Sequence, residues 1–203
     1  MRELIVHGGG GHARVVIDSA IAQGHHVVLV CDPNITGELY GIPVENDFTT
    51  NGYPQASAVI AVGDNAVRYQ IAPRIKHGFA NIIHPSAVCS PFASMGIGNA
   101  VLQKAVIQAE SMIGNHVIIN TGAQVDHHCS IGDFVHIAPG VILCGNVQIG
   151  EGTFMGAGSI VIPGKKVGAW SIVGAGSVVI DNIPDNVVAV GNPARVIKYV
   201  KRP

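Results

Sequence analysis

The chain has 203 residues, 48% of them apolar, and a formal net charge of −1. This much apolar material can bury a core, which excludes a disordered chain. No run of Lys or Arg provides the positive surface that holds nucleic acid or an anionic membrane. No eighteen successive residues are apolar, so we expect a cytoplasmic protein without membrane insertion, whose partners are small molecules or other protein chains.

The first 82 residues predict a small α/β domain. Three apolar runs are typical of buried strands, at residues 4–6, 27–32 and 57–63. After the first run, five apolar residues fall on one helical face: Ala13, Val16, Ile17, Ala20 and Ile21. Residues 65–78 predict a second helix, which Pro73 weakens. Strands that alternate with helices in this way indicate a parallel sheet.

A glycine-rich turn joins the first predicted strand to the first helix. Gly8, Gly10 and Ala13 match the pattern G-x-G-x-x-A, and Asp32 ends the next strand. Such a turn lets a phosphate approach the N–H groups at a helix start, although a tight turn without a ligand is the alternative. A dinucleotide site needs two such halves, and this domain has room for one. We therefore expect a nucleotide or a nucleotide-linked sugar rather than NAD.

From Ile83 onward the chain repeats every six residues. The positions at this spacing are all apolar: Ile83, Cys89, Met95, Val101, Ile107, Ile113, Ile119, Val125, Ile131, Ile137, Leu143, Ile149, Met155, Val161, Val167, Val173 and Val179. A period of six fits neither a helix nor an alternating strand, but it fits short strands separated by regular corners. We predict a solenoid, in which the Gly that recurs one place after these positions adopts backbone conformations that other residues resist.

The stretches IGDFVHIAPG, IGEGTFMGAGS and VGAWSIVGAGS resemble the hexapeptide repeat of the left-handed β-helix acyltransferases. In that family three hexads form one triangular coil, so seventeen hexads imply between five and six coils. The whole chain, with GGGGH in the first domain, IIHPSA at the junction and VGNPARV near the end, resembles the bacterial sugar acyltransferases. That group includes the N-acetyltransferases that act on UDP-4-amino sugars of the bacillosamine pathway and the sialic acid O-acetyltransferases.

The resemblance implies a Rossmann-like nucleotide-sugar domain over residues 1–82 and a left-handed parallel β-helix over residues 83–203. It also implies acetyl-CoA as the co-substrate and a homotrimer with the active site between subunits. The residues that match the family's nucleotide-sugar site are Gly10, Gly11, His12, Asp32, Gly63, Asp64 and Asn65. One departure is Pro33, which stands where relatives often have a second acid.

Three histidines, His127, His128 and His136, lie within ten residues of one another in the solenoid. With eighteen residues in each coil, His128 stacks between Glu110 and Asn146, and no histidine stacks on another. We therefore expect no metal site within one chain, which leaves a site shared between subunits as the alternative.

The resemblance also assigns roles in the solenoid. His127 matches the general base, which takes the proton that the amine loses when it attacks a thioester. His136 matches a contact with the thioester region of acetyl-CoA, and Asn120 matches a polar residue of the same wall. The backbone of Ala157 and Ala175 matches positions that bind the pantetheine arm.

One place departs from the family pattern. Related enzymes commonly have an acid directly after the base, but this chain has His128 there. Asp126 or Asp133 could orient His127 instead, although adjacent residues of an extended chain tend to face opposite ways. The simpler interpretation of His128 is an exposed polar residue of the coil.

Taken together, the residues and the resemblance predict an acetyl-CoA-dependent N-acetyltransferase. Its acceptor would be the amino group of a nucleotide-linked 4-amino-4,6-dideoxy sugar, with UDP as the favoured nucleotide, for bacterial surface glycan or glycoprotein biosynthesis. O-acetylation of a sialic acid or another sugar is the alternative within the same class. A non-catalytic trimeric scaffold that binds a nucleotide is the alternative from another class.

Overall fold

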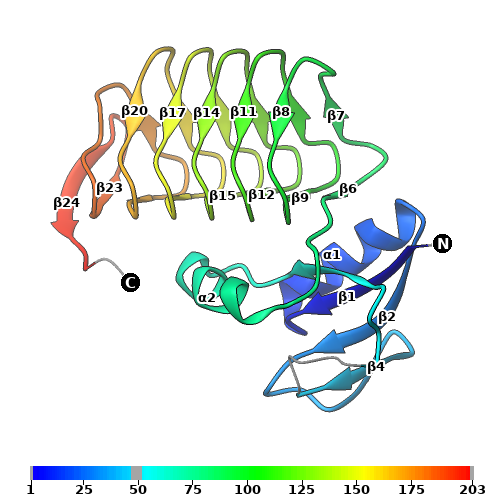
Figure 1. Cartoon of the computed structure of the whole chain (residues 1–203). Helices are drawn as coiled ribbons and strands as arrows, with labels where there is room; N and C mark the ends of the chain where they lie inside the picture. The colour runs from blue at the N-terminus through cyan, green and yellow to red at the C-terminus, as the bar shows by residue number, and fades with distance from the viewer. Residues whose placement is uncertain (1, 47–51, 202–203) are drawn as a thin grey trace.

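The computed structural model describes residues 2–46 and 52–201 (Figure 1). The first part of the chain forms a five-stranded sheet with the strand order β3-β4-β2-β1-β5. Its elements are β1 (Arg2–His7), α1 (Gly11–Ala22), β2 (His25–Cys31), β3 (Gly37–Leu39), β4 (Ile42–Glu45), β5 (Ser57–Ile60), α2 (Asn65–Ile71) and the 3₁₀-helix η1 (Ala72–Arg74). β1 runs parallel to β2 and β5, and β4 runs parallel to β2, as the alternation of strands and helices predicts.

This domain differs from the prediction in three places. β3 and β4 form an unpredicted hairpin, in which Tyr40 and Gly41 have φ values of 56° and 75°. Such turns favour Asn-Gly or Asp-Gly, so Tyr-Gly gives a weak sequence signal. The second helix ends at Ile71 rather than residue 78, because Pro73 allows only a short 3₁₀ turn beyond it. Ile21 is 54% exposed and lies outside the buried face of α1.

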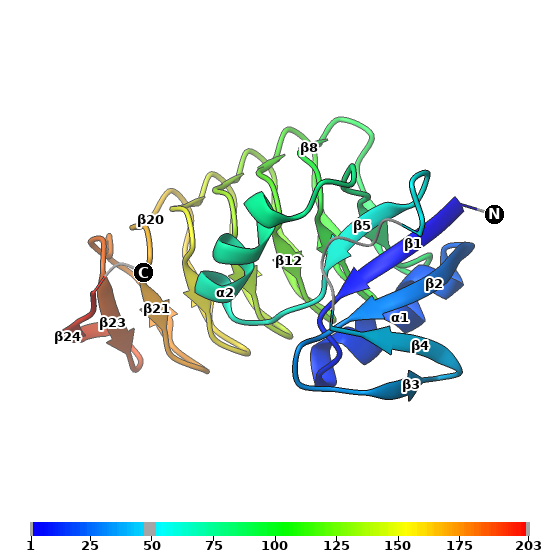
Figure 2. The ribbon, with the colours of Figure 1, turned by 60° about the horizontal axis from the view of Figure 1, so that its bottom comes forward.

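The second part is a three-sided solenoid of two-residue strands (Figures 1 and 2). These strands are β6 (Ile82–Ile83), β7 (Val88–Cys89), β8 (Ser94–Met95), β9 (Ala100–Val101), β10 (Val106–Ile107), β11 (Met112–Ile113), β12 (Ile118–Ile119), β13 (Gln124–Val125), β14 (Ser130–Ile131), β15 (His136–Ile137), β16 (Ile142–Leu143), β17 (Gln148–Ile149), β18 (Phe154–Met155), β19 (Ile160–Val161), β20 (Lys166–Val167), β21 (Ile172–Val173) and β22 (Val178–Val179). Every third strand pairs in parallel with the next of its set, so the chain needs eighteen residues for one coil.

Each side of the solenoid is one sheet, and we name the sides by their strand numbers. The six-stranded face contains β7, β10, β13, β16, β19 and β22, and the five-stranded face contains β8, β11, β14, β17 and β20. The eight-stranded face contains β6, β9, β12, β15, β18 and β21, and it ends with β23 (Val187–Val190) and β24 (Arg195–Tyr199). The seventeen strands from β6 to β22 make just under six coils, which confirms the predicted number.

The second residue of each short strand points into the solenoid. From Val101 to Val179 these residues are at most 4% exposed, so the apolar period of the sequence marks the core. Ile83, Cys89 and Met95 are only partly buried, because they belong to the first coil, whose open end no earlier coil covers.

The recurring Gly residues do not have the role that the sequence suggests. Counting the apolar residue as the first of each hexad, positive φ falls on the fourth place and not on the second. Seven non-glycine residues adopt it there: Lys104, Glu110, His116, His128, Phe134, Asn146 and Trp170. At the second place of the hexads on the five-stranded face, the coils lie too close for a side chain, since a Cβ on Gly132 would lie 2.6 Å from the backbone nitrogen of Glu151.

Helix α2 fixes the first domain to one corner of the solenoid (Figure 2). The Arg68 side chain is 1% exposed, and it donates from Nε to the His116 carbonyl at 2.9 Å and from Nη2 to the Phe134 carbonyl at 2.7 Å. Asn65 donates from Nδ2 to the Gly152 carbonyl at 3.0 Å. These three carbonyls are spaced by eighteen residues, so α2 contacts three successive coils at the corner between the five- and eight-stranded faces.

Among residues 2–46 and 52–201, no helix combines the length and the apolar character needed to cross a membrane.

Candidate active site

His136 lies on β15, where the eight-stranded face meets the first domain. Its Nδ1 is 3.1 Å from the carbonyl oxygen of Gly63, and its Nε2 is 3.1 Å from Nδ2 of Asn120. The Asn120 oxygen accepts the N–H of Thr121 at 2.8 Å, which turns its amide nitrogen toward the ring. Because a carbonyl only accepts, Nδ1 of His136 carries the proton and Nε2 accepts from Asn120.

Burial keeps His136 neutral. Desolvation lowers its pKa to about 4, repulsion from Arg68 and His12 adds to this, and the hydrogen bond to Gly63 opposes it. His12, in the first turn of α1, has its ring centroid 5.9 Å from that of His136. Desolvation and Arg68 lower its pKa to about 4 as well, and its Nε2 has no hydrogen-bond partner among the described residues. Four predicted site residues therefore meet here: His12, Gly63, Asn120 and His136.

Asp32 closes the glycine-rich turn. Its Oδ2 accepts the N–H of Gly9 at 2.7 Å, and its Oδ1 accepts the N–H of Asn34 at 2.8 Å. A cavity of about 520 Å³ opens beside it, lined in part by Gly8, Asp32, Asn34, Val67 and Gln70. An added Cβ on Gly10 or Gly11 would meet nothing within 4 Å, so there is open space for a ligand in front of the helix start.

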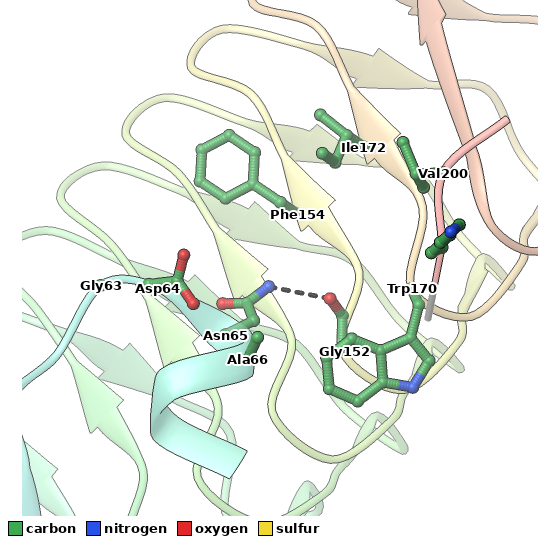
Figure 3. A pocket seen from close by; sticks show the side chains of 10 residues that line it. Gly63, Asp64, Asn65, Ala66, Gly152, Phe154, Trp170, Ile172 and Val200 are labelled. Carbon is green, nitrogen blue, oxygen red and sulfur yellow. Dashed lines mark hydrogen bonds between the residues drawn. The ribbon is translucent and has the colours of Figure 1, made fainter. Parts of the chain in front are cut away.

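A second cavity of about 640 Å³ lies between the start of α2 and the solenoid (Figure 3). Gly63, Asp64 and Asn65 line it on one side, and Phe154, Trp170 and Ile172 line it on the other. Asp64 also caps α2 by accepting the N–H of Val67 at 2.9 Å. The Asn65 amide is engaged at both ends, since Oδ1 accepts from Arg68 and Nδ2 donates to Gly152. Asn65 thus shapes this cavity from a fixed position.

Ala157 and Ala175 lie eighteen residues apart at the corner between the eight- and six-stranded faces. Both are exposed, and the Ala157 carbonyl accepts the N–H of Gly176 at 2.8 Å. Asn120 follows β12 at the same corner, two coils before Ala157. Asn120, Ala157 and Ala175 therefore lie along one edge of the eight-stranded face, and His136 lies on that face beside Asn120.

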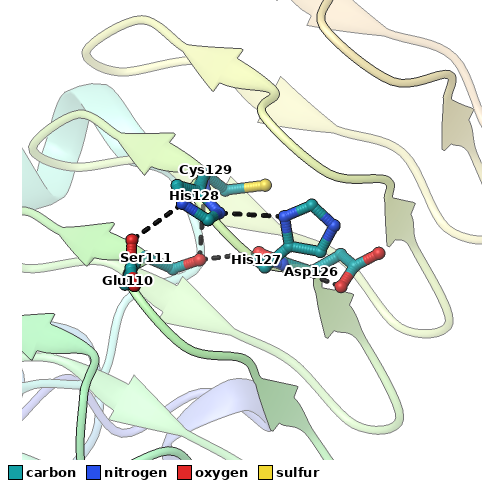
Figure 4. A network of polar contacts seen from close by, with 6 residues as sticks. All are labelled: Glu110, Ser111, Asp126, His127, His128 and Cys129. Atoms are coloured by element: carbon teal, nitrogen blue, oxygen red, sulfur yellow. Dashed lines mark hydrogen bonds and ion pairs between the residues drawn. The ribbon is translucent and has the colours of Figure 1, made fainter.

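His127 and His128 occupy a different corner, in the turn between β13 and β14 (Figure 4). Nδ1 of His127 is 3.0 Å from Nδ1 of His128, and Nε2 of His128 is 2.7 Å from Oε2 of Glu110. The His127 ring packs over Gly145 of the next coil, where an added Cβ would lie 2.7 Å from Nε2 of the ring. The three side chains form a chain of polar contacts that ends at a carboxylate.

The two acids considered from the sequence are occupied elsewhere. Asp126 Oδ1 accepts the backbone N–H of His127 at 2.8 Å, and Asp133 Oδ1 accepts the N–H of Asn115 at 2.7 Å. Sequence reasoning therefore missed Glu110 as the acid of this cluster. The signal was present, because the spacing of eighteen residues already places Glu110 beside His128.

Within one chain, the cluster with His127 and the site with His136 lie on different sides of the solenoid. The corner with His127 lies between the six- and five-stranded faces, and in a three-sided coil that corner is opposite the eight-stranded face with His136. Among the described residues, no group of three His, Cys, Asp or Glu side chains could hold a metal ion.

Comparisons with known proteins agree with this architecture. Residues 3–75 match the PglD N-terminal domain, and residues 128–163 match the bacterial transferase hexapeptide repeats. The chain is 40% identical to a perosamine N-acetyltransferase from Caulobacter crescentus, solved in complex with CoA and GDP-perosamine, over 98% of both chains and with a TM-score of 0.94. The acetyltransferase domain of PglB from Neisseria gonorrhoeae, solved with acetyl coenzyme A, is 38% identical over 97% of this chain and 99% of that one, with a TM-score of 0.93.

Curated sequences match over shorter stretches. UDP-N-acetylbacillosamine N-acetyltransferase of Bacillus subtilis is 41% identical over 112 residues, which are 50% of this chain and 52% of that protein. The chain thus spans about half of that relative, and it spans 23% of a mimivirus protein that it also matches.

The fold and the site define a hexapeptide-repeat acyltransferase with a PglD N-terminal domain. Within this class, the near-complete overlap with solved structures at 40% and 38% identity shows that the chain belongs to the family of amino-sugar N-acetyltransferases that carry a PglD N-terminal domain.

Proposed function

We propose that this chain transfers the acetyl group of acetyl-CoA to the amino group of a nucleotide-linked 4-amino-4,6-dideoxy sugar. The observation that carries the proposal is the meeting of His12, Gly63, Asn120 and His136 between the two domains, in a chain that matches a GDP-perosamine-bound relative over nearly its whole length. We place the nucleotide in the cavity beside Asp32, with the sugar extending past Gly63 toward the cavity with Phe154 and Trp170.

The chemistry needs a base with a free lone pair. The sugar amine attacks the thioester carbonyl, the C–S bond breaks, and the amine loses one proton. Nε2 of His136 already accepts from Asn120, so this ring is poorly suited to receive that proton. Among the described residues, no donor forms a hydrogen bond with Nε2 of the exposed His127 ring, which supports His127 as the general base.

We propose that the active site combines residues from more than one copy of the chain. His127 lies on the corner opposite the face that carries His136, so a base and a substrate on the same chain would lie on opposite sides of the solenoid. We propose a homotrimer in which the His127 corner of one subunit completes the His136 site of its neighbour. Val88 and Met112, which are 62% and 57% exposed on the six- and five-stranded faces, are apolar residues that such a neighbour would cover.

The test measures CoA release with a panel of acceptors: UDP- and GDP-linked 4-amino sugars, and sialic acids as hydroxyl acceptors. We expect turnover with at least one nucleotide-linked amino sugar. The free amine of that acceptor should be converted to an amide in the product. CoA release with sialic acids alone would favour O-acetylation. If none of the acceptors raised CoA release above the rate of background hydrolysis, a non-catalytic scaffold would be favoured.

His127→Ala should lower kcat at least about 100-fold, the usual contribution of a general base, while nucleotide-sugar binding is kept. His26→Ala, at an exposed histidine of β2, is the matched control and should change kcat little. Unchanged kcat in His127→Ala would remove this residue from the mechanism.

Mixing two inactive variants tests the shared site. Subunits with His127→Ala and subunits with His136→Asn, unfolded and refolded together, should regain activity, because some interfaces then combine an intact His127 with an intact His136. A mixture as inactive as its components, or a monomer by light scattering, would contradict the trimeric arrangement.

A further inference from the structure

Where the family pattern has an acid after the base, this chain has a relay of three side chains, His127, His128 and Glu110. His128 follows the base directly, and Glu110 lies one coil earlier, eighteen residues back in the chain. Both have left-handed backbone conformations, with φ values of 58° and 61°, so their side chains leave the same corner in similar directions. The backbone N–H of His128 also donates to the Ala109 carbonyl at 3.1 Å, which fixes the two coils in register.

We propose that Glu110 is a positioning residue that acts through His128 to orient His127 and fix its tautomer. This inference rests on the proposed function, in which His127 is the base. The Glu110 carboxylate, which acts on His127 through the ring of His128, would take the place of the acid that relatives commonly have directly after the base.

The contacts determine which nitrogen of each ring carries a proton. A carboxylate only accepts, so the 2.7 Å contact with Glu110 places a proton on Nε2 of His128. In a neutral His128, Nδ1 is then an acceptor, and the 3.0 Å contact between the two Nδ1 atoms requires His127 to donate. His127 therefore carries its proton on Nδ1 and presents the lone pair of Nε2.

The same arrangement supports the protonated state of the base. When Nε2 of His127 takes the proton of the amine, the resulting imidazolium keeps its Nδ1–H bond to His128, whose own N–H is held by the Glu110 carboxylate. The other carboxylate at this turn, Asp126, binds a backbone N–H rather than either ring. Glu110 is thus the acid that both imidazoles can use.

The relay would strengthen on assembly. In one chain the His128 and Glu110 side chains are 56% and 63% exposed, and water weakens an ion pair at that exposure. A neighbouring subunit that covers this corner would exclude water and strengthen the contacts.

The first test uses Glu110→Gln, which keeps the size of the side chain and removes its charge. We expect kcat to fall at least about tenfold with KM for the nucleotide sugar unchanged, because a base held in the wrong tautomer is slow rather than weakly binding. The acid limb of the kcat/KM profile should move to lower pH. His128→Glu in the Glu110→Gln background places an acid directly after the base and should recover activity. Glu38→Gln, at an exposed glutamate of β3, is the control.

The second test does not depend on activity. Imidazole ¹⁵N shifts of the free protein, recorded at neutral pH, should show His127 as the Nδ1–H tautomer in the wild type and as a mixture in Glu110→Gln. Unchanged kcat in Glu110→Gln, or the same His127 tautomer in this variant as in the wild type, would overturn the relay. If His127→Ala were inactive while Glu110→Gln were fully active, the proposed function would survive and the relay would fail.

Discussion

Arg68→Met should destabilise α2 and its docking on the solenoid by about 3–6 kcal/mol. The buried guanidinium donates at 2.7–2.9 Å to three backbone carbonyls, those of His116 and Phe134 in the solenoid and that of Val62 in its own domain. Leaving one buried acceptor without its donor costs about 1–3 kcal/mol, and three such losses at the lower half of that range give the total. Met fills most of the volume, so a cavity adds little.

The assay uses the single tryptophan of the chain. Trp170 is 7% exposed, and the ring of Tyr69 from α2 packs edge-on against it with 5.5 Å between centroids. Its fluorescence therefore reports whether α2 is docked, while far-UV circular dichroism reports the rest of the fold. With a urea dependence of about 2 kcal/mol/M, in the middle of the usual range, the fluorescence midpoint should fall by about 1.5–3 M.

The control for this prediction is Lys76→Met, which changes an exposed cation just beyond η1. It should shift the free energy of unfolding by no more than about 0.5 kcal/mol. A fluorescence midpoint in Arg68→Met that equals that of Lys76→Met would show that the buried hydrogen bonds of Arg68 do not hold the two domains together.

Two further predictions concern single rings. Burial lowers the pKa of His116 to about 4, so between pH 6.5 and 4 the unfolded chain binds more protons than the folded one and the free energy of unfolding falls as the pH falls. His116→Phe, which suits a ring stacked on Phe134, should make this fall shallower in urea titrations at pH 7 and pH 5; an unchanged slope would contradict it. Gly145→Ala would displace the His127 ring and should lower kcat about tenfold or more with the fold intact by circular dichroism, whereas full activity would show that the ring position is unimportant.

The repeat explains why much of the solenoid could be predicted. Every sixth residue from Ile83 to Val179 is apolar, and that period fixes the inward positions, the stacking interval of eighteen and the number of coils. It also placed Glu110 beside His128, because both occupy the fourth place of hexads one coil apart. What the period could not supply is the rotation of a ring, which decides whether stacked residues form a contact.

The junction between the domains was not predictable in the same way. Arg68 and Asn65 sit in a short helix of ordinary composition, and their partners are backbone carbonyls that any residue would provide. The same holds for Asp32, whose place at a strand end suggests a ligand contact although its oxygens bind the backbone N–H groups of Gly9 and Asn34. A contact with a backbone group does not depend on the side chain of the partner residue, so the sequence does not reveal it.

The geometry of stacked coils suggests how a catalytic acid can change its place in the sequence. In a solenoid, the residue after the base lies beside both the base and the residue eighteen positions before itself, so a carboxylate can act either at the place after the base or, one coil earlier, through the side chain at that place. Moving the acid from the place after His127 to Glu110 lengthens the path by one ring, and His128 fills that gap with a group that accepts on one nitrogen and donates on the other. An apolar or a purely donating residue at position 128 would break the path. For this reason His128→Lys should be as slow as Glu110→Gln, even though Lys would still pair with Glu110.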